Sequence, residues 1–208
     1  MAARRLPRMA APSRVFLLSP ASTAGKRAQL LLNDAATFDL AVRVRDVAGV
    51  PLGEVFSFLS GLYFRGKLAY ARTFARPAGA IHVITSDRGL MSPEQSITIK
   101  DLRAMAAGSI DHAHEPYRTP LVRDAQLLQA SLDPAGQVVL LGSIATEKYV
   151  AVLSKVFGSQ LFFPLDFVGR GDMSRGGLML RSVREGRELD YAPVMNAVRR
   201  GARPGKSG

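Results

Sequence analysis

The chain has 208 residues, of which 47% are hydrophobic and 22% are charged, as is typical of a folded globular protein. The absence of cysteine excludes disulfides, thiolate nucleophiles and sulfur-ligated metal centres, and only three histidines are present. No apolar run approaches the roughly 18 to 20 residues that a membrane-spanning helix needs. We therefore expect a cytoplasmic protein that has no membrane partner, binds no metal and needs no cofactor.

The net charge of +11 is concentrated at the two ends of the chain. Residues 1–14 and 196–208 each carry four basic side chains and no acidic one, which leaves +3 on residues 15–195. We therefore predict a basic flexible extension over 1–14, a single domain over 15–195 and a basic flexible tail over 196–208. The tails either hold the phosphate backbone of a nucleic acid or simply remain solvated. Residues 1–14 share the Arg- and Ala-rich composition of transit peptides, but we favour an untargeted extension.

Four short apolar runs predict buried strands, with helical segments between them. The runs lie at residues 15–18, 80–85, 138–141 and 161–163. The helices are predicted at 28–32, in two pieces around Gly61 between 51 and 74, at 102–107 behind a capping box of Thr98 and Asp101, at 120–132, and at 146–157. Strands that are apolar on both faces favour a sheet covered on both sides. The prediction is an α/β fold with a mostly parallel sheet of about four strands and helices on both faces.

In such a sheet, ligands bind beyond the carboxyl ends of the strands. The loop after the first strand precedes a helix, which is the position of a phosphate-binding loop. It is not a Walker A motif, because Ser19 replaces the first glycine and Arg27 stands where a hydroxyl would bind magnesium. The hydroxyls of Ser22 and Thr23, the amine of Lys26 and the free N–H groups of the helix can still hold a phosphate. The alternative is an ordinary helix N-terminus with a solvated lysine.

A second candidate lies on the helix that follows Gly61. Tyr63, Lys67 and Tyr70 are spaced so that they share one helical face. Aromatic rings beside a cation are suited to stacking on nucleic-acid bases, and Tyr63 is the candidate for that role. The alternative is that the aromatic side chains of this segment pack in the core while Arg65 and Lys67 are exposed.

Residues 164–177 follow the fourth strand with four glycines, two arginines, two aspartates and no apolar periodicity. This pattern predicts a long functional loop at the ligand edge of the sheet. Arg170 and Arg175 can donate bidentate hydrogen bonds to a phosphate, and Asp172 can act as a base or position a water. The alternative is that Asp172 pairs with an arginine and fastens the loop.

Two segments resemble known proteins. The sequence Leu-Tyr-Phe-Arg at 62–65, followed by Lys-Leu-Ala-Tyr-Ala at 67–71 and Ser-x-x-Gly-Leu-x-x-Pro at 86–93, resembles a family of small bacterial and phage α/β domains. Leu-Ser-Pro-Ala at 18–21 is more distantly similar to the opening of the YaaA-like peroxide-stress proteins. That resemblance implies DNA binding and a role in the response to oxidative stress. The segment 138–149 with the later glycine-rich loop is similar in layout to uracil-DNA glycosylases.

These observations favour a protein that binds a phosphate-bearing ligand, a nucleic acid or a nucleotide, at the carboxyl edge of its sheet. It is either a binding protein or a nucleoside- or base-processing enzyme of the glycosylase kind. In such an enzyme Asp172 would be the base, and Ser19 and Ser86 would donate to the base or sugar. The alternative is a non-catalytic interaction protein whose basic tails dock an acidic partner. An enzyme should bring Ser19, Ser86 and Asp172 to one pocket, whereas an adaptor should scatter them. The sequence leaves the oligomeric state open.

Overall fold

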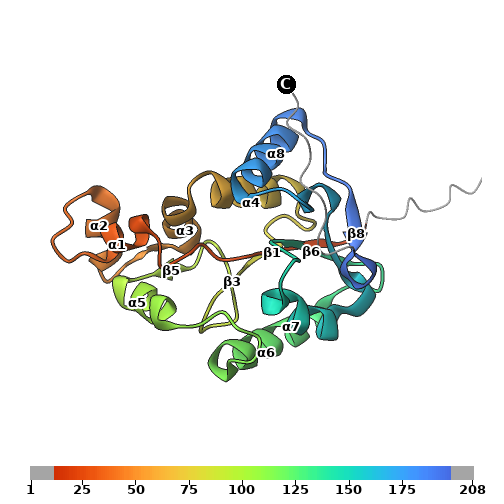
Figure 1. Cartoon of the computed structure of the whole chain (residues 1–208), viewed down its shortest axis with the longest axis horizontal. Coiled ribbons are helices and arrows are strands. Elements are labelled where there is room, and N and C mark those ends of the chain that lie inside the picture. Colours follow the sequence, from red (N-terminus) through yellow and green to blue (C-terminus); the bar gives the residue numbers. More distant parts are fainter. Residues whose placement is uncertain (1–11, 198–208) are drawn as a thin grey trace, which may run out of the picture.

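The computed structural model describes residues 12–197, and its centre is a six-stranded sheet (Figure 1). In spatial order the strands are β4 (Leu90–Met91), β3 (Ile81–Ile84), β1 (Arg14–Leu18), β6 (Gln137–Leu141), β7 (Leu161–Pro164) and β8 (Tyr191–Pro193). The four predicted strands are β3, β1, β6 and β7, and they are adjacent and parallel. The short edge strands β4 and β8 pair antiparallel to them, so the sheet is mixed and larger than predicted.

Helices surround this sheet and a second, two-stranded sheet of β2 (Val50–Pro51) and β5 (Ser96–Ile97). The helices are α1 (Lys26–Leu32), α2 (Asp39–Arg45), α3 (Leu52–Ser60), α4 (Leu62–Phe74), α5 (Ile99–Ala107), α6 (Glu115–Ser131), α7 (Glu147–Phe157) and α8 (Asp172–Glu185). In the part of the chain that the structure describes, no helix combines the length and the hydropathy needed to cross a membrane.

The two faces of the central sheet are covered by different helices (Figure 1). Helices α4 and α8 lie on one face, and α6 and α7 lie on the other. Because side chains alternate along a strand, Phe16 and Leu18 of β1 enter the core under α4 and α8, whereas Val15 and Leu17 enter the core under α6 and α7. The predicted α/β class and the predicted helices on both faces are therefore confirmed.

Several helices begin or end at the residues that the sequence predicts. Gly61, with a φ of 57°, separates α3 from α4, and Gly158, with a φ of 51°, ends α7. The backbone N–H of Thr98 donates to Asp101 over 2.7 Å, which forms half of the capping box that opens α5. The predicted start of α6 at Pro120 is wrong, because the helix begins at Glu115 and contains Pro120.

The predicted long loop over 164–177 is also wrong, because most of this segment is helical. Only a short 3-10 helix, Leu165–Phe167, and a few residues separate β7 from α8, which begins at Asp172. Gly176 and Gly177 lie inside α8, although each glycine in a helix costs about 1 kcal/mol relative to alanine. Packing against α4 therefore overrides the weak helical propensity of this segment.

Two glycines allow α4 and α8 to approach closely. A Cβ on Gly66 of α4 would lie 2.8 Å from the carbonyl oxygen of Gly176, and a Cβ on Gly176 of α8 would lie 2.9 Å from the carbonyl oxygen of Leu62. Any larger side chain at either position would push the two backbones apart. This contact places Asp172, in the first turn of α8, beside Tyr63 at the start of α4.

The predicted N-terminal boundary also shifts. Arg14, the last residue of the predicted basic extension, is the first residue of β1 and forms an ion pair with Glu188. Its guanidinium also donates to the side-chain oxygen of Gln137 over 2.6 Å. One of the charges attributed to the tails is thus paired at the amino end of β1, a central strand. Residues 12–13 and 196–197 of the predicted tails are also described, and Asn196 ends a short 3-10 helix, Val194–Asn196. Residues 1–11 and 198–208 lie outside the described residues.

Candidate functional site

A pocket of about 600 Å³ opens at the carboxyl edge of the parallel strands. Ser19 directly follows β1 and Ser143 lies shortly after β6, and both residues line it. Eight of the lining side chains carry a hydroxyl: Ser19, Ser22, Thr23, Ser60, Tyr63, Ser109, Ser143 and Tyr149. The charged lining residues are Asp172 and Lys148. We call this site the hydroxyl pocket.

Lys67 lies behind the wall of the hydroxyl pocket and is completely buried. Its amine donates to the carbonyl oxygen of Ser19 over 2.5 Å and to the Ser19 hydroxyl oxygen over 3.0 Å. The amine also lies 4.4 Å from the centre of the Tyr63 ring, one helical turn earlier on α4. The alternative prediction that Lys67 is exposed is therefore wrong, because its helical face points toward the sheet.

Burial sets the protonation behaviour of Lys67. Removal from water lowers its pKa to about 7, an effect that Asp172 opposes and Arg175 reinforces. Lys67 forms no ion pair among the described residues, and Asp172, the carboxylate that acts on it, lies 3.7 Å from the guanidinium of Arg175. Near neutral pH, Lys67 can therefore accept or release a proton.

Tyr63 is also buried, with only 6% of its surface exposed. Its hydroxyl has no hydrogen-bond partner among the described residues. Burial raises the pKa of Tyr63, while the nearby Arg175 and Ser19 side chains act in the opposite direction. Because one face of the ring already carries the Lys67 amine, little ring surface remains for the predicted stacking on a base. The free hydrogen-bonding capacity of Tyr63 is at its hydroxyl.

Asp172 begins α8, and its side chain is 69% exposed where it lines the hydroxyl pocket. Arg175, one turn later, is not a lining residue, and its Nε and Nη2 atoms donate to the carbonyl oxygen of Phe167 over 3.1 and 2.8 Å. Arg170 donates to the Ser174 hydroxyl over 3.3 Å and does not line the pocket. The two arginines predicted to hold phosphate thus bind the protein itself, and Arg175 fastens the turn before α8.

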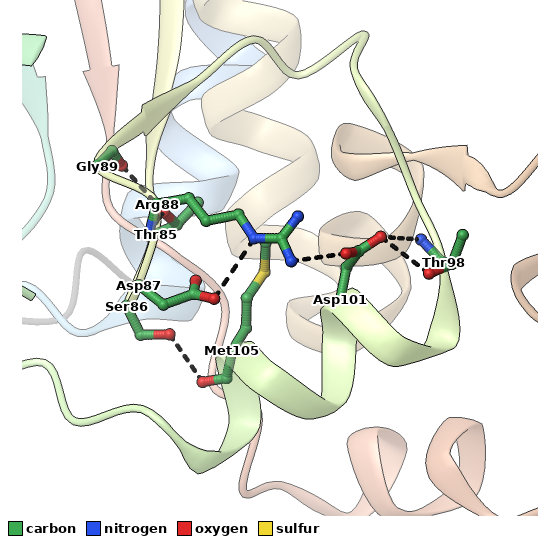
Figure 2. Close-up of polar contacts among 8 residues, drawn as sticks. All are labelled: Thr85, Ser86, Asp87, Arg88, Gly89, Thr98, Asp101 and Met105. Carbon is green, nitrogen blue, oxygen red and sulfur yellow. Dashed lines mark hydrogen bonds and ion pairs between the residues drawn. The ribbon is translucent and has the colours of Figure 1, made fainter. Parts of the chain in front are cut away.

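The loop after β3 is held by its own polar side chains (Figure 2). The Ser86 hydroxyl donates to the carbonyl oxygen of Met105 near the end of α5 over 2.8 Å. The Arg88 guanidinium bridges Asp87 and Asp101, at 3.4 and 2.6 Å. Ser86 is therefore an anchor of the loop, which corrects its predicted role as a donor to the ligand.

Ser86 lies close to the hydroxyl pocket without lining it. A Cβ on Gly108, a lining residue, would be 2.8 Å from the Ser86 hydroxyl oxygen. The structure thus brings Ser19 and Asp172 to one pocket and leaves Ser86 behind its wall.

Of the other residues predicted to bind phosphate, two line the hydroxyl pocket and one does not. Ser22 and Thr23 line the hydroxyl pocket, and the Ser22 hydroxyl accepts a hydrogen bond from the backbone N–H of Ala24 over 3.4 Å. Lys26 is the first residue of α1 and is exposed, but it is not one of the lining residues. The loop after β1 therefore contributes its hydroxyls to the site rather than its lysine.

Sequence reasoning missed the contribution of α7. Lys148 and Tyr149 lie in its first turn and line the hydroxyl pocket opposite α8. Burial raises the pKa of Tyr149, as do its neighbours Tyr63 and Asp172. The helix after a parallel strand starts at the ligand edge of the sheet, so the same rule that points to the loops could have pointed to these two residues.

No protein-family model, curated protein or solved structure matches this chain. The resemblances to the bacterial and phage α/β domains and to the YaaA-like proteins therefore stay predictions. Residues 12–197 contain no group of three or more histidine, aspartate or glutamate side chains arranged to hold a metal ion. The function is accordingly inferred from the chemistry of the hydroxyl pocket.

Proposed function

We propose that the protein binds a nucleoside or nucleotide in the hydroxyl pocket and acts on the bond between its sugar and its base. The observation that carries this proposal is the meeting of Asp172 and Ser19 in one pocket whose wall is dominated by hydroxyl groups. Hydroxyls both donate and accept hydrogen bonds, which suits the mixed donor and acceptor pattern of a sugar and a base edge. A predominantly cationic site would suit a bare phosphate better.

The size of the pocket supports one nucleotide rather than a duplex. Its volume of about 600 Å³ is within the range of about 300 to 1,000 Å³ that is typical of small-molecule sites. A nucleic acid would therefore present a single base that has left the stack, as in other proteins that do chemistry on a base. Lys148, at the wall of the pocket, can hold the neighbouring phosphate of such a nucleic acid.

Asp172 is the residue that we assign to the chemistry. Its exposed carboxylate can activate a water molecule or stabilise the positive charge that develops on the sugar as the bond to the base breaks. Arg175 holds the turn that precedes α8, and its guanidinium lies 3.7 Å from the carboxylate. Asp172 is thus exposed at the pocket and lies in a helical turn that Arg175 holds.

Calorimetric titration with nucleosides, nucleoside monophosphates and short single-stranded oligonucleotides tests the proposal. We expect saturable binding of at least one of them and cleavage of its base by the wild type. Asp172→Asn should bind with similar affinity and lose cleavage, because the change removes the charge but retains the size of the side chain. Asp166→Asn is the matched control, since Asp166 is exposed just after β7 and does not line the pocket. Absence of binding by every ligand would refute the proposal.

A further inference from the structure

A buried amine that forms no ion pair among the described residues lies directly behind the Ser19 hydroxyl. Lys67 is fully buried, and among the described residues both hydrogen bonds of its amine go to Ser19. Ser19 in turn lines the hydroxyl pocket, so these contacts place it between the amine and the pocket. A buried charge is costly unless a partner of opposite charge accompanies it. The geometry therefore leaves a place for a negative charge on the pocket side of Ser19.

We propose that Ser19, Tyr63 and Lys67 form an anion subsite in the hydroxyl pocket, in which the buried amine takes up a proton when an anionic group of the ligand binds to the two hydroxyls. This inference rests on the proposed function, because it assigns the phosphate of the nucleotide to this wall. It also reassigns the phosphate from Arg170 and Arg175, whose guanidinium groups bind Ser174 and Phe167 instead.

Two hydroxyls are available for the anion. The Tyr63 hydroxyl is buried in the wall of the pocket and has no hydrogen-bond partner among the described residues. The Ser19 hydroxyl donates to the carbonyl oxygen of Leu141 over 3.3 Å, a long hydrogen bond, so it can turn toward a ligand at little cost. An oxyanion at this wall would accept from both hydroxyls while Lys67 continues to donate to Ser19.

The charged and titratable groups around Lys67 determine how anion binding and protonation of its amine affect each other. From α8, Asp172 raises the pKa of Lys67 and Arg175 lowers it, while burial has the largest effect and brings it to about 7. Tyr63 from α4 carries the amine over its ring, and Tyr149 from α7 is in turn a neighbour of Tyr63. Burial keeps both phenols protonated by raising their pKa values. An anion about 5 Å away would raise the pKa of Lys67 by about 1 to 3, because it favours the charged amine.

The coupling between anion binding and protonation of Lys67 has a sign that can be measured. The neutral amine predominates in the free protein at pH 8, so binding of an anion there takes up a proton. At pH 6 the amine is already protonated and the uptake disappears. The affinity for an anion of constant charge should therefore be about five- to tenfold weaker at pH 8 than at pH 6.

The experiment follows the lysine side-chain signals by NMR while the pH is varied, first without ligand and then with sulfate, which remains a dianion throughout. We expect one lysine to titrate near neutral pH, to disappear in Lys67→Met and to shift to higher pH with sulfate. Nucleoside monophosphates should cause the same shift. Lys155→Met is the matched control, because Lys155 is exposed on α7 and does not line the pocket.

The outcomes separate this inference from the proposed function. A Lys67 that titrates near the ordinary lysine value of about 10.4 would overturn the anion subsite. Binding of a nucleotide without any change in the titration of Lys67 would also overturn it and would leave the proposed function intact. A shift with sulfate, together with no recognition of any nucleoside or nucleotide, would support the subsite and refute the proposed function. Binding of neither class of ligand would overturn both.

Discussion

The close crossing of α4 and α8 makes a prediction that connects helix packing with the site. In Gly176→Ala the new Cβ would stand 2.9 Å from the carbonyl oxygen of Leu62 and 3.0 Å from the Tyr63 Cα, both of which are backbone atoms. Since a backbone cannot yield as a flexible side chain can, the helices must separate. We expect the free energy of unfolding to fall by about 1 to 3 kcal/mol, the usual cost of overpacking. For a protein of this size, each kcal/mol lowers Tm by about 2 to 4 °C.

Gly177→Ala is the matched control on the same helix. A Cβ at Gly177 would meet no atom within 4 Å, so only the higher helical propensity of alanine remains. We expect this variant to gain about 0.5 to 1 kcal/mol of stability. Urea denaturation followed by circular dichroism measures both changes, and cleavage by Gly176→Ala should also be slower because Asp172 moves away from Tyr63. Equal stability of the two variants would refute the role given to the crossing.

Two further predictions concern the loop in Figure 2. The backbone N–H of Thr98 and, in addition, the side chains of Thr98 and Arg88 lower the pKa of Asp101, so its contribution is present above the ordinary carboxyl pKa of about 3.9 and is lost as the pH falls through the lowered value. Asp101→Asn should cost about 1 kcal/mol at neutral pH and show less acid sensitivity in urea titrations, whereas an unchanged acid profile would contradict this assignment. Ser86→Ala should cost about 1 to 3 kcal/mol without weakening nucleotide binding, because it leaves a buried carbonyl oxygen of α5 unpaired. Ser109→Ala, at the wall of the pocket, should weaken nucleotide binding without lowering the stability. If Ser86→Ala weakened binding and Ser109→Ala lowered the stability instead, the roles of the two serines would be exchanged.

Much of the fold follows from short-range signals in the sequence. The apolar runs identify β1, β3, β6 and β7 because parallel strands are buried on both faces. The edge strands β4 and β8 contain two and three residues, which is too short for a recognisable alternation. Helix α8 could not be predicted, because two adjacent glycines signal a loop unless the close approach of α4 is known.

The candidate site was predictable only in part, because contacts between segments that are distant in the sequence decide the rest of it. The rule that ligands bind at the carboxyl edge of a parallel sheet is enough to indicate Ser19, Ser22 and Asp172 from the sequence alone. It could not show that Arg175 directs its donors to a backbone carbonyl group, since that contact depends on the turn after β7. A lysine is almost never fully buried, so the position of Lys67 could not be expected from its residue type either.

The central claim, that the hydroxyl pocket binds a nucleoside or nucleotide, is tested most directly by mapping where such a ligand binds. Backbone amide chemical shifts recorded during a titration with nucleoside monophosphates report this residue by residue. We expect the largest changes at Ser19, Tyr63, Tyr149 and Asp172, which surround the pocket. Changes confined to another cavity, of about 400 Å³ beside His112 between α6 and α7, would contradict the claim.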